Sequence, residues 1–222
     1  MRKGIFIIGT DTGVGKTFIA CGIAAALRSC GVDVGVMKPA ESGCRVKNGG
    51  LVPADSLRLM TAAGVADSLS LVNPYRFGKP LAPAIAAELE GKDVSVGRIM
   101  KAYAALSRRH DFMIVEGAGG IMVPLSDKAL LLDLAGSLGL PVLIVARPGL
   151  GTINHTLLTV EALRNREIPI AGIVVNHSTD AKPGLSEKTN PAVLERFSGV
   201  RITAIIPYGA RDFVSLAHSL RK

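Results

Sequence analysis

The residues at positions 9–17, Gly-Thr-Asp-Thr-Gly-Val-Gly-Lys-Thr, are of types that together can bind phosphate. An apolar run precedes them at 4–8 and a helical pattern follows at 18–27, so the stretch is predicted to join a strand to a helix. Glycine amides can turn toward an anion there, and the helix N-terminus adds partial positive charge. This context predicts that Lys16 reaches the outer phosphates of a nucleotide and that Thr17 holds Mg2+.

The loop differs from the usual phosphate-binding spacing by one residue. Position 10 is threonine, and Gly9 lies one residue earlier than the common pattern requires, so the loop is interpreted as a variant with an insertion. An ordinary strand-to-helix turn would explain the glycines. It would not explain a lysine and a threonine at the start of the helix.

Four further polar residues stand at strand ends or helix starts. Glu116 follows an apolar run, where a carboxylate can lie beside a metal bound to the loop or can cap the next turn. Lys38 ends an apolar stretch, as a solvated terminus or as a cation for a transferred phosphate. Asp55 opens a predicted helix and could be only its N-cap. Asn176 could read a base edge or cap a loop.

Short apolar strands alternate with helical patterns along the chain. This alternation predicts a single α/β domain over 1–222, P-loop NTPase-like, with a doubly wound and mostly parallel sheet and helices on both faces. Strands are predicted at 4–9, 32–38, 112–116, 141–146, 170–176 and 202–206. Helices are predicted at 15–30, 53–63, 83–90, 96–109, 130–138, 152–166, 191–197 and from 213. Loops or irregular segments are predicted at 41–50, 64–80, 117–120 and 177–190. Ligands bind such sheets beyond the carboxyl ends of the strands.

Composition narrows the partners. The net charge of +8 suits an anionic ligand, but basic residues are spread along the chain without interleaved aromatics, so no nucleic acid partner is expected. The first apolar run is too short for a membrane span, and no membrane partner is expected. Three widely spaced cysteines, Cys21, Cys30 and Cys44, favour a reducing, cytoplasmic location.

These motifs together resemble the dethiobiotin synthetase family. The resemblance rests on the variant loop at 9–17, on Lys38-Pro39 with Ser42-Gly43, on Asn73-Pro74-Tyr75 and Pro83, on Val115 to Gly120, on Pro124 to Asp127, and on Gly149 to His155. The motifs occur in order from about residue 4 to residue 208. The resemblance implies an ATP- and Mg2+-dependent cyclo-ligase that converts 7,8-diaminononanoate and CO2 to dethiobiotin. It also implies a homodimer with composite active sites.

The resemblance further implies roles for individual residues. Those implied for catalysis are Lys38, Lys16 and Thr12. Those implied for ATP are Gly13, Val14, Gly15, Lys16, Thr17, Phe18, Asp55, Glu116, Gly117, Ala118, Gly119, Asn176, His177, Pro207, Tyr208 and Gly209. Those implied for Mg2+ are Thr17, Asp55 and Glu116. Those implied for the diamine or its carbamate are Thr12 and Ser42, with Gly151, Thr152, Ile153 and Asn154 from the partner subunit.

Two other P-loop classes match the sequence less well. A partition- or division-type ATPase would carry a lysine early in the loop, where this chain has Thr10, Asp11 and Thr12. A nucleotide switch protein would carry an Asn-Lys-x-Asp base reader, which Asn176 and the three residues after it do not match. The segment after Pro207 offers only Asp212 as an acidic residue for the ribose, so nucleotide selectivity stays open.

Overall fold

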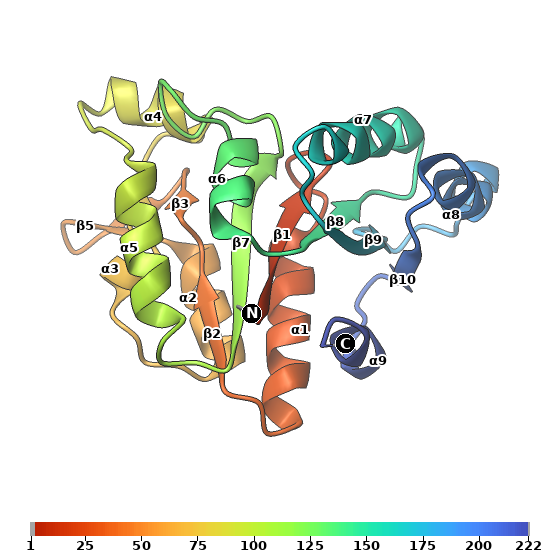
Figure 1. Ribbon diagram of the computed structural model, residues 1–222, viewed down its shortest axis with the longest axis horizontal. Helices are drawn as coiled ribbons and strands as arrows, with labels where there is room; N and C mark the ends of the chain where they lie inside the picture. Colours follow the sequence, from red (N-terminus) through yellow and green to blue (C-terminus); the bar gives the residue numbers. More distant parts are fainter. Residues whose placement is uncertain (1–2, 222) are drawn as a thin grey trace.

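A six-stranded parallel sheet forms the centre of the computed structural model, which describes residues 3–221 (Figure 1). Its strand order is β10-β9-β8-β1-β7-β2. The neighbouring strands pair in parallel throughout. The strands are β1 (Gly4–Gly9), β2 (Val34–Met37), β7 (Phe112–Gly120), β8 (Val142–Ala146), β9 (Ile170–Asn176) and β10 (Ile202–Ile206).

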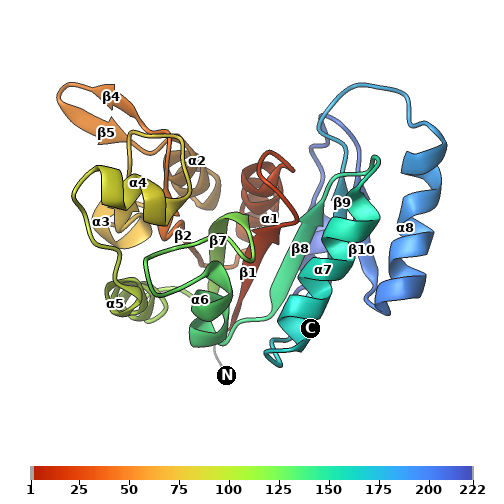
Figure 2. The same cartoon turned by 90° about the horizontal axis from the view of Figure 1, so that it is seen from above.

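Helices cover both faces of this sheet. Figure 2 shows α1 (Lys16–Ser29) and α2 (Ala54–Ala63) on one face and α5 (Val96–Leu106), α6 (Leu131–Leu138) and α7 (Thr152–Arg164) on the other. The remaining helices are α3 (Leu69–Val72), α4 (Pro83–Leu89), α8 (Leu185–Ser198) and α9 (Val214–Ser219), of which α9 packs against α1. The predicted fold class is confirmed.

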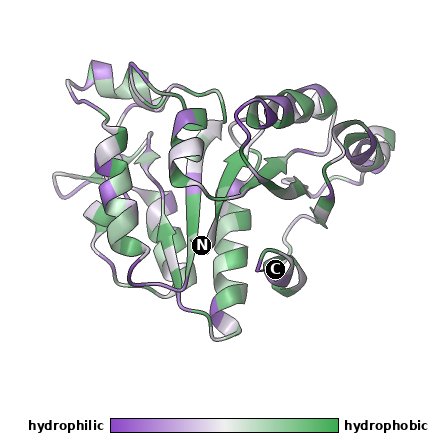
Figure 3. Ribbon diagram, in the orientation of Figure 1, coloured by the Kyte–Doolittle hydropathy of each residue, from purple (hydrophilic) through white to green (hydrophobic). Residues whose placement is uncertain are grey.

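The strands in the middle of the sheet are apolar along nearly their whole length, as Figure 3 shows. Every residue of β1 and β8 is buried. A parallel sheet with helices on both faces excludes water from both sides, so its strands read as continuous Val, Ile and Leu runs. The hydrophobic pattern of the sequence was therefore sufficient to locate them.

The order of the strands places the phosphate loop at the centre of one edge. From β1 the chain crosses to the edge strand β2 and returns to β7, which lies between β1 and β2, and then passes to β8, β9 and β10 on the other side of β1. The carboxyl end of β1 is thus a topological switch point, where connections leave in opposite directions and open a crevice. The loop that follows β1 lies at this crevice.

The segment 117–120, predicted as a loop, is part of a strand. β7 continues through Gly120, which pairs with Gly9 of β1. Glycine has a low intrinsic preference for strands, so the glycine-rich sequence of this segment led to the prediction of a loop. Here the ladder with β1 supplies the pairing. A side chain at Gly117 would meet the side chains of Ile8 and Phe6, so the absence of a Cβ lets this strand pack closely.

Two other predictions of irregular structure were wrong. The segment 41–50 contains most of a hairpin, β4 (Arg45–Lys47) with β5 (Gly50–Val52), turned at Asn48 and Gly49, which both have positive φ. The segment 64–80 contains α3 and β6 (Tyr75–Arg76), and β6 pairs with β3 (Ala40–Glu41). These elements are too short to produce a clear periodicity.

The helix predicted at 191–197 begins earlier than expected. α8 starts at Leu185, so Pro191 lies inside it rather than at its first turn. Proline is favoured in the first turn of a helix, and for this reason the helix was predicted to begin at Pro191. No helix within residues 3–221 has both the length and the hydropathy needed to cross a membrane.

Candidate active site

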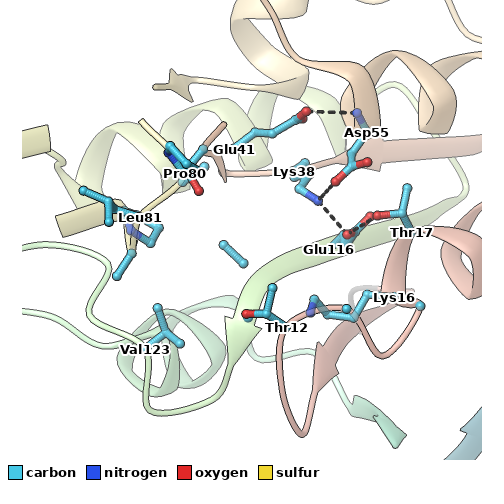
Figure 4. Close-up of a pocket in the computed structure, with 18 of the residues that line it drawn as sticks. Thr12, Lys16, Thr17, Lys38, Glu41, Asp55, Pro80, Leu81, Glu116 and Val123 are labelled. Atoms are coloured by element: carbon cyan, nitrogen blue, oxygen red, sulfur yellow. Dashed lines mark hydrogen bonds and ion pairs between the residues drawn. The ribbon is translucent and has the colours of Figure 1, made fainter. Parts of the chain in front are cut away.

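A cavity of about 740 Å³ opens at the carboxyl edge of the sheet, beside the phosphate loop (Figure 4). Many of the residues predicted for the site line it. They are Thr12, Gly13, Gly15, Lys16, Thr17, Phe18, Lys38, Ser42, Asp55, Glu116, Ala118 and Gly119. They come from the loop after β1, the start of α1, the ends of β2 and β3, the start of α2 and the middle of β7.

The phosphate loop is held in shape by its own polar atoms. Gly15 precedes α1 with φ near 95°, and a side chain there would collide with the amide of Asn176. The Lys16 ammonium donates to the Asp11 carbonyl oxygen at 3.1 Å. The Asp11 carboxylate accepts from the Thr12 N–H at 2.7 Å and from Arg147 at 2.8 Å. Asp11, in the lengthened loop, is therefore anchored to Arg147, which directly follows β8.

The Lys38 ammonium lies between two carboxylates. Its Nζ atom donates to Asp55 Oδ2 at 2.6 Å and to Glu116 Oε1 at 2.7 Å. The Thr17 hydroxyl donates to the same Glu116 oxygen at 2.7 Å. Figure 4 shows this continuous chain of polar contacts along one wall of the cavity. It joins residues 17, 38, 55 and 116, which are far apart in the sequence.

Burial and charge shift the pKa values of these groups in opposite directions. Burial lowers the pKa of Lys16 to about 8, although the nearby Glu116 carboxylate partly opposes this. Burial alone would also lower the pKa of Lys38, but the carboxylates of Glu116 and Asp55 outweigh it and raise that pKa. Burial would raise the pKa of Asp55, and the Lys38 ammonium overcomes this and lowers it. Lys38 and Asp55 are therefore both charged at neutral pH.

The oxygens beside Lys38 suit a hard divalent cation. Thr17 supplies a hydroxyl, and Asp55 and Glu116 supply carboxylates. Glu116 Oε2 is buried and has no hydrogen-bond partner within residues 3–221. The described residues contain no cluster of three or more His, Cys, Asp or Glu side chains that could hold a metal ion. The arrangement fits Mg2+, which binds through one or two carboxylates and takes its other ligands from phosphates and water.

Several predicted residues lie away from this cavity. Asn176 ends β9 behind the phosphate loop, where its amide nitrogen donates to the Val14 carbonyl oxygen at 2.9 Å. His177, Pro207 and Tyr208 line a separate hollow of about 560 Å³, next to Gly209. Gly117 is covered by the side chains of Ile8 and Phe6. The segment at 151–154, from Gly151 to Asn154, forms the start of α7 and does not line the main cavity.

Two charged residues in the cavity wall were not singled out by the sequence patterns. Arg58 follows Asp55 by three positions on α2, so the two side chains lie on the same helix face. Glu41 ends β3 and is 5% exposed. Its only sequence signal is its position three residues after Lys38, within a segment that was predicted to be a loop.

Comparison with known proteins identifies the family of this chain. A family model described as an AAA domain matches residues 3–211. The ATP-dependent dethiobiotin synthetase of Thermodesulfovibrio yellowstonii is 44% identical, over 94% of this chain and 90% of that protein. The chain belongs to the dethiobiotin synthetase family. The corresponding protein of Anaeromyxobacter dehalogenans is 48% identical, over 93% and 90% of the two chains. The resemblance inferred from the sequence motifs is confirmed.

Solved structures outside the dethiobiotin synthetase family share the fold. The cell division ATPase MinD of Pyrococcus furiosus superposes with a TM-score of 0.58 at 18% identity, covering 99% of this chain and 98% of that one. A ParA family ATPase from Chlorobium tepidum gives 0.54 at 17% identity, covering 99% and 88%. At these identities the likeness shows the P-loop architecture alone.

Proposed function

We propose that the chain is an ATP- and Mg2+-dependent cyclo-ligase that converts 7,8-diaminononanoate and CO2 to dethiobiotin, with release of ADP and phosphate. The observation that carries this proposal is the position of the Lys38 ammonium, which pairs with Asp55 and Glu116 on the cavity wall beside Thr17 of the phosphate loop. Relatives that are 44% and 48% identical carry this function in their names. The chain acts as one domain over 1–222.

The reaction requires charge stabilisation and positioning more than proton transfer. One amine of the substrate adds to CO2 and loses a proton, which gives a carbamate. A carbamate oxygen attacks the γ-phosphorus of ATP and ADP leaves, which gives a carbamic-phosphoric anhydride. The second amine attacks the carbonyl carbon and loses a proton, the five-membered cyclic urea closes, and phosphate leaves. Orienting such groups is worth about 7–11 kcal/mol in favourable cases.

The residues of the cavity suit these steps. Lys16 and Lys38 place two cations where the carbamate and the transferred phosphoryl group carry negative charge. Thr12 and Ser42 offer hydroxyls to the diamine or its carbamate. The amides of 13–18 face the phosphates at the start of α1. His–carboxylate acid–base machinery is not needed.

Mg2+ would be held by Thr17, Asp55 and Glu116 together with the nucleotide. When bound, it neutralises negative charge on the β- and γ-phosphates. Glu116 Oε2, which has no donor among the described residues, supports this assignment, since a buried acceptor without a donor is costly unless a ligand completes it.

The base would lie beside Asn176, His177 and the segment Pro207–Gly209. Asn176 Oδ1 is buried without a hydrogen-bond partner in the described chain, while its amide nitrogen is engaged by Val14. The free oxygen can therefore accept from an exocyclic amine. Adenine carries such an amine, and so does cytosine, whereas guanine presents a carbonyl at the corresponding edge.

The substrate carboxylate would be bound by Gly151–Asn154 of the partner subunit in a homodimer. Exposed apolar side chains before and along α7 support this surface, because Leu150 is 87% exposed and Leu158, in the middle of the helix, is 61% exposed. Met122, 56% exposed, lines a hollow of about 450 Å³ with Leu158. Large exposed apolar groups that gather in one region mark an interaction surface.

An enzyme that consumes ATP in this way would work in the cytoplasm.

The test is a reconstituted reaction with Mg-ATP, bicarbonate and 7,8-diaminononanoate. Mass spectrometry should find dethiobiotin in amounts equal to the ADP released, and a sedimentation run should find a dimer. A folded dimer that hydrolyses ATP without forming the ring would overturn the proposed function.

A further inference from the structure

Glu41 is a buried carboxylate next to the cavity whose contacts all point to one neighbouring helix. Its Oε1 atom accepts from the Asp55 N–H at 2.9 Å. Its Oε2 atom accepts from the Ser56 N–H at 3.0 Å and from the Ser56 hydroxyl at 2.7 Å. Figure 4 shows Glu41 directed toward the backbone of Asp55. Three donors from the first turn of α2 thus bind a side chain that belongs to β3.

The start of α2 has an unmet need for such an acceptor. The first N–H groups of a helix have no partners within the helix. The residue at the N-cap position is Pro53, and no side chain caps the helix from there. A carboxylate in front of these amides satisfies them and is stabilised by the positive end of the helix dipole. Glu41 supplies this cap from a strand that lies earlier in the chain.

Glu41 is itself held from the opposite side. Its carbonyl oxygen accepts from the Phe77 N–H at 2.8 Å and from the Cys44 thiol at 3.5 Å. β3 pairs with β6, and Glu41 is opposite Arg76 in that pair. The position of the Glu41 backbone is therefore set by its pairing with β6 and by the contacts from Phe77 and Cys44.

The cap formed by Glu41 constrains the backbone of Asp55. The N–H that Glu41 binds is the backbone amide of the residue whose carboxylate binds Lys38 at 2.6 Å. Asp55 lies in the first turn of a helix that follows a hairpin, and its side chain is 36% exposed, with Lys38 as its partner in the site. The buried cap fixes the backbone from which this carboxylate projects.

We propose that Glu41 is a positioning residue that sets Asp55 for the divalent cation and for Lys38. This role rests on the proposed function, in which Asp55 is a metal ligand. Glu41 acts through α2 because its two oxygens are engaged by that helix, and it does not itself contact the reacting atoms.

The test measures metal binding without turnover. Mn2+ is titrated into the protein saturated with ADP, in the absence of the diamine, and followed by electron paramagnetic resonance. Glu41→Ala should weaken Mn2+ binding by roughly 10–100-fold, the range found when partners that orient metal ligands are removed. ADP affinity in EDTA should stay unchanged. Glu41→Gln should recover part of the loss, since its amide oxygen still accepts from α2.

Two controls separate positioning from general stability. Ser56→Ala removes one hydroxyl donor but leaves both N–H contacts to Glu41, so Mn2+ affinity should change little. His110→Ala destabilises the opposite edge of the sheet, and it should leave Mn2+ affinity at the wild-type level. If Glu41→Ala does not fold, Glu41→Gln decides between the outcomes.

Equal Mn2+ affinity in the wild type and the Glu41 variants would overturn the role of Glu41 and leave the proposed function standing. A raised KM for the diamine with unchanged Mn2+ affinity would also overturn it, because Glu41 would then contact the substrate. If the wild-type chain binds no Mn2+ with ADP, the proposed function fails and this role fails with it.

Discussion

The amino ends and the carboxyl ends of β2 and β7 each carry a cluster in which one basic group lies between two carboxylates. The two clusters differ in how many of their hydrogen-bonding atoms have partners. At the amino ends, the His110 imidazole lies between Asp33 at 2.8 Å and Asp67 at 2.8 Å. At the carboxyl ends, the Lys38 ammonium lies between Asp55 and Glu116. In each case one cationic or protonatable group ties together three separate segments of chain.

The difference is in unused hydrogen-bonding capacity. At the amino end both imidazole nitrogens of His110 are engaged, and the second oxygen of Asp67 accepts from Arg109 at 3.0 Å. At the carboxyl end Glu116 Oε2 has no partner among residues 3–221, and a cavity lies beside it. The first cluster is complete as it stands and stabilises the fold. The second leaves a buried acceptor open beside a cavity, as the proposed ligand site requires.

The largest expected effect separates the two clusters by activity. Lys38→Met should lower the rate of ring formation by about 10²–10³-fold, the usual cost of removing one charge-stabilising donor. His110→Gln should leave the rate near the wild-type value. Steady-state assays of dethiobiotin formation measure both, with circular dichroism to confirm folding. Comparable losses of activity in the two variants would show that the two clusters do not differ in their contribution to catalysis.

The next effect separates the clusters by stability. His110→Ala removes hydrogen bonds to two carboxylates and should lower the free energy of unfolding by about 2 kcal/mol, since bonds to charged groups contribute about 1.5–3 kcal/mol. Urea unfolding of the ligand-free protein measures the change. An unchanged midpoint would show that the amino-end cluster does not stabilise the fold.

A smaller effect tests the unused acceptor at Asn176. ATP and CTP present an amino group to its Oδ1 atom, and GTP presents a carbonyl. ATP and CTP should therefore support ring formation with a kcat/KM about tenfold above that of GTP, as expected for a single discriminating hydrogen bond of about 1.4 kcal/mol. Competition assays with the three nucleotides measure the ratio. Equal kcat/KM values for the three nucleotides would show that Asn176 does not bind the base.

The smallest effect is the pH dependence of the amino-end cluster. Burial would lower the pKa of His110, but its bonds to Asp33 and Asp67 outweigh this and raise that pKa above its ordinary value of 6.5. The stabilisation from the protonated ring is thus fully present below about pH 6.5 and is lost as the pH rises through the folded-state pKa. The stability difference between wild type and His110→Ala should narrow across that rise. A difference that grows with pH would contradict the assignment.

The sequence predicted the site best where chemistry and periodicity coincide. The glycine loop, Lys16 and Thr17 follow a long apolar run, and a parallel sheet brings Lys38 and Glu116 to the same edge. Whether Lys38 faces solvent or the cavity could not be decided from sequence, because this depends on where α2 delivers Asp55. The structure places Lys38 inside, 5% exposed.

The sequence was least informative where contacts between short elements determine the structure. β3 and β6 have two residues each and pair across a long interval of chain. Glu41 caps α2 from β3, so neither its strand nor its role produces a local pattern. The glycines of β7 have weak strand propensity and depend on β1 for pairing. Tertiary contacts override local preference in these segments.

The central claim is that this site phosphorylates a carbamate, and an isotope measurement tests it most directly. Freshly added C18O2 is supplied with Mg-ATP and 7,8-diaminononanoate in ordinary water, and the released phosphate is analysed by mass spectrometry before CO2 exchanges with the solvent. One oxygen of each phosphate should carry the label, because the carbamate oxygen leaves bound to phosphorus. Unlabelled phosphate, formed together with dethiobiotin, would contradict the account.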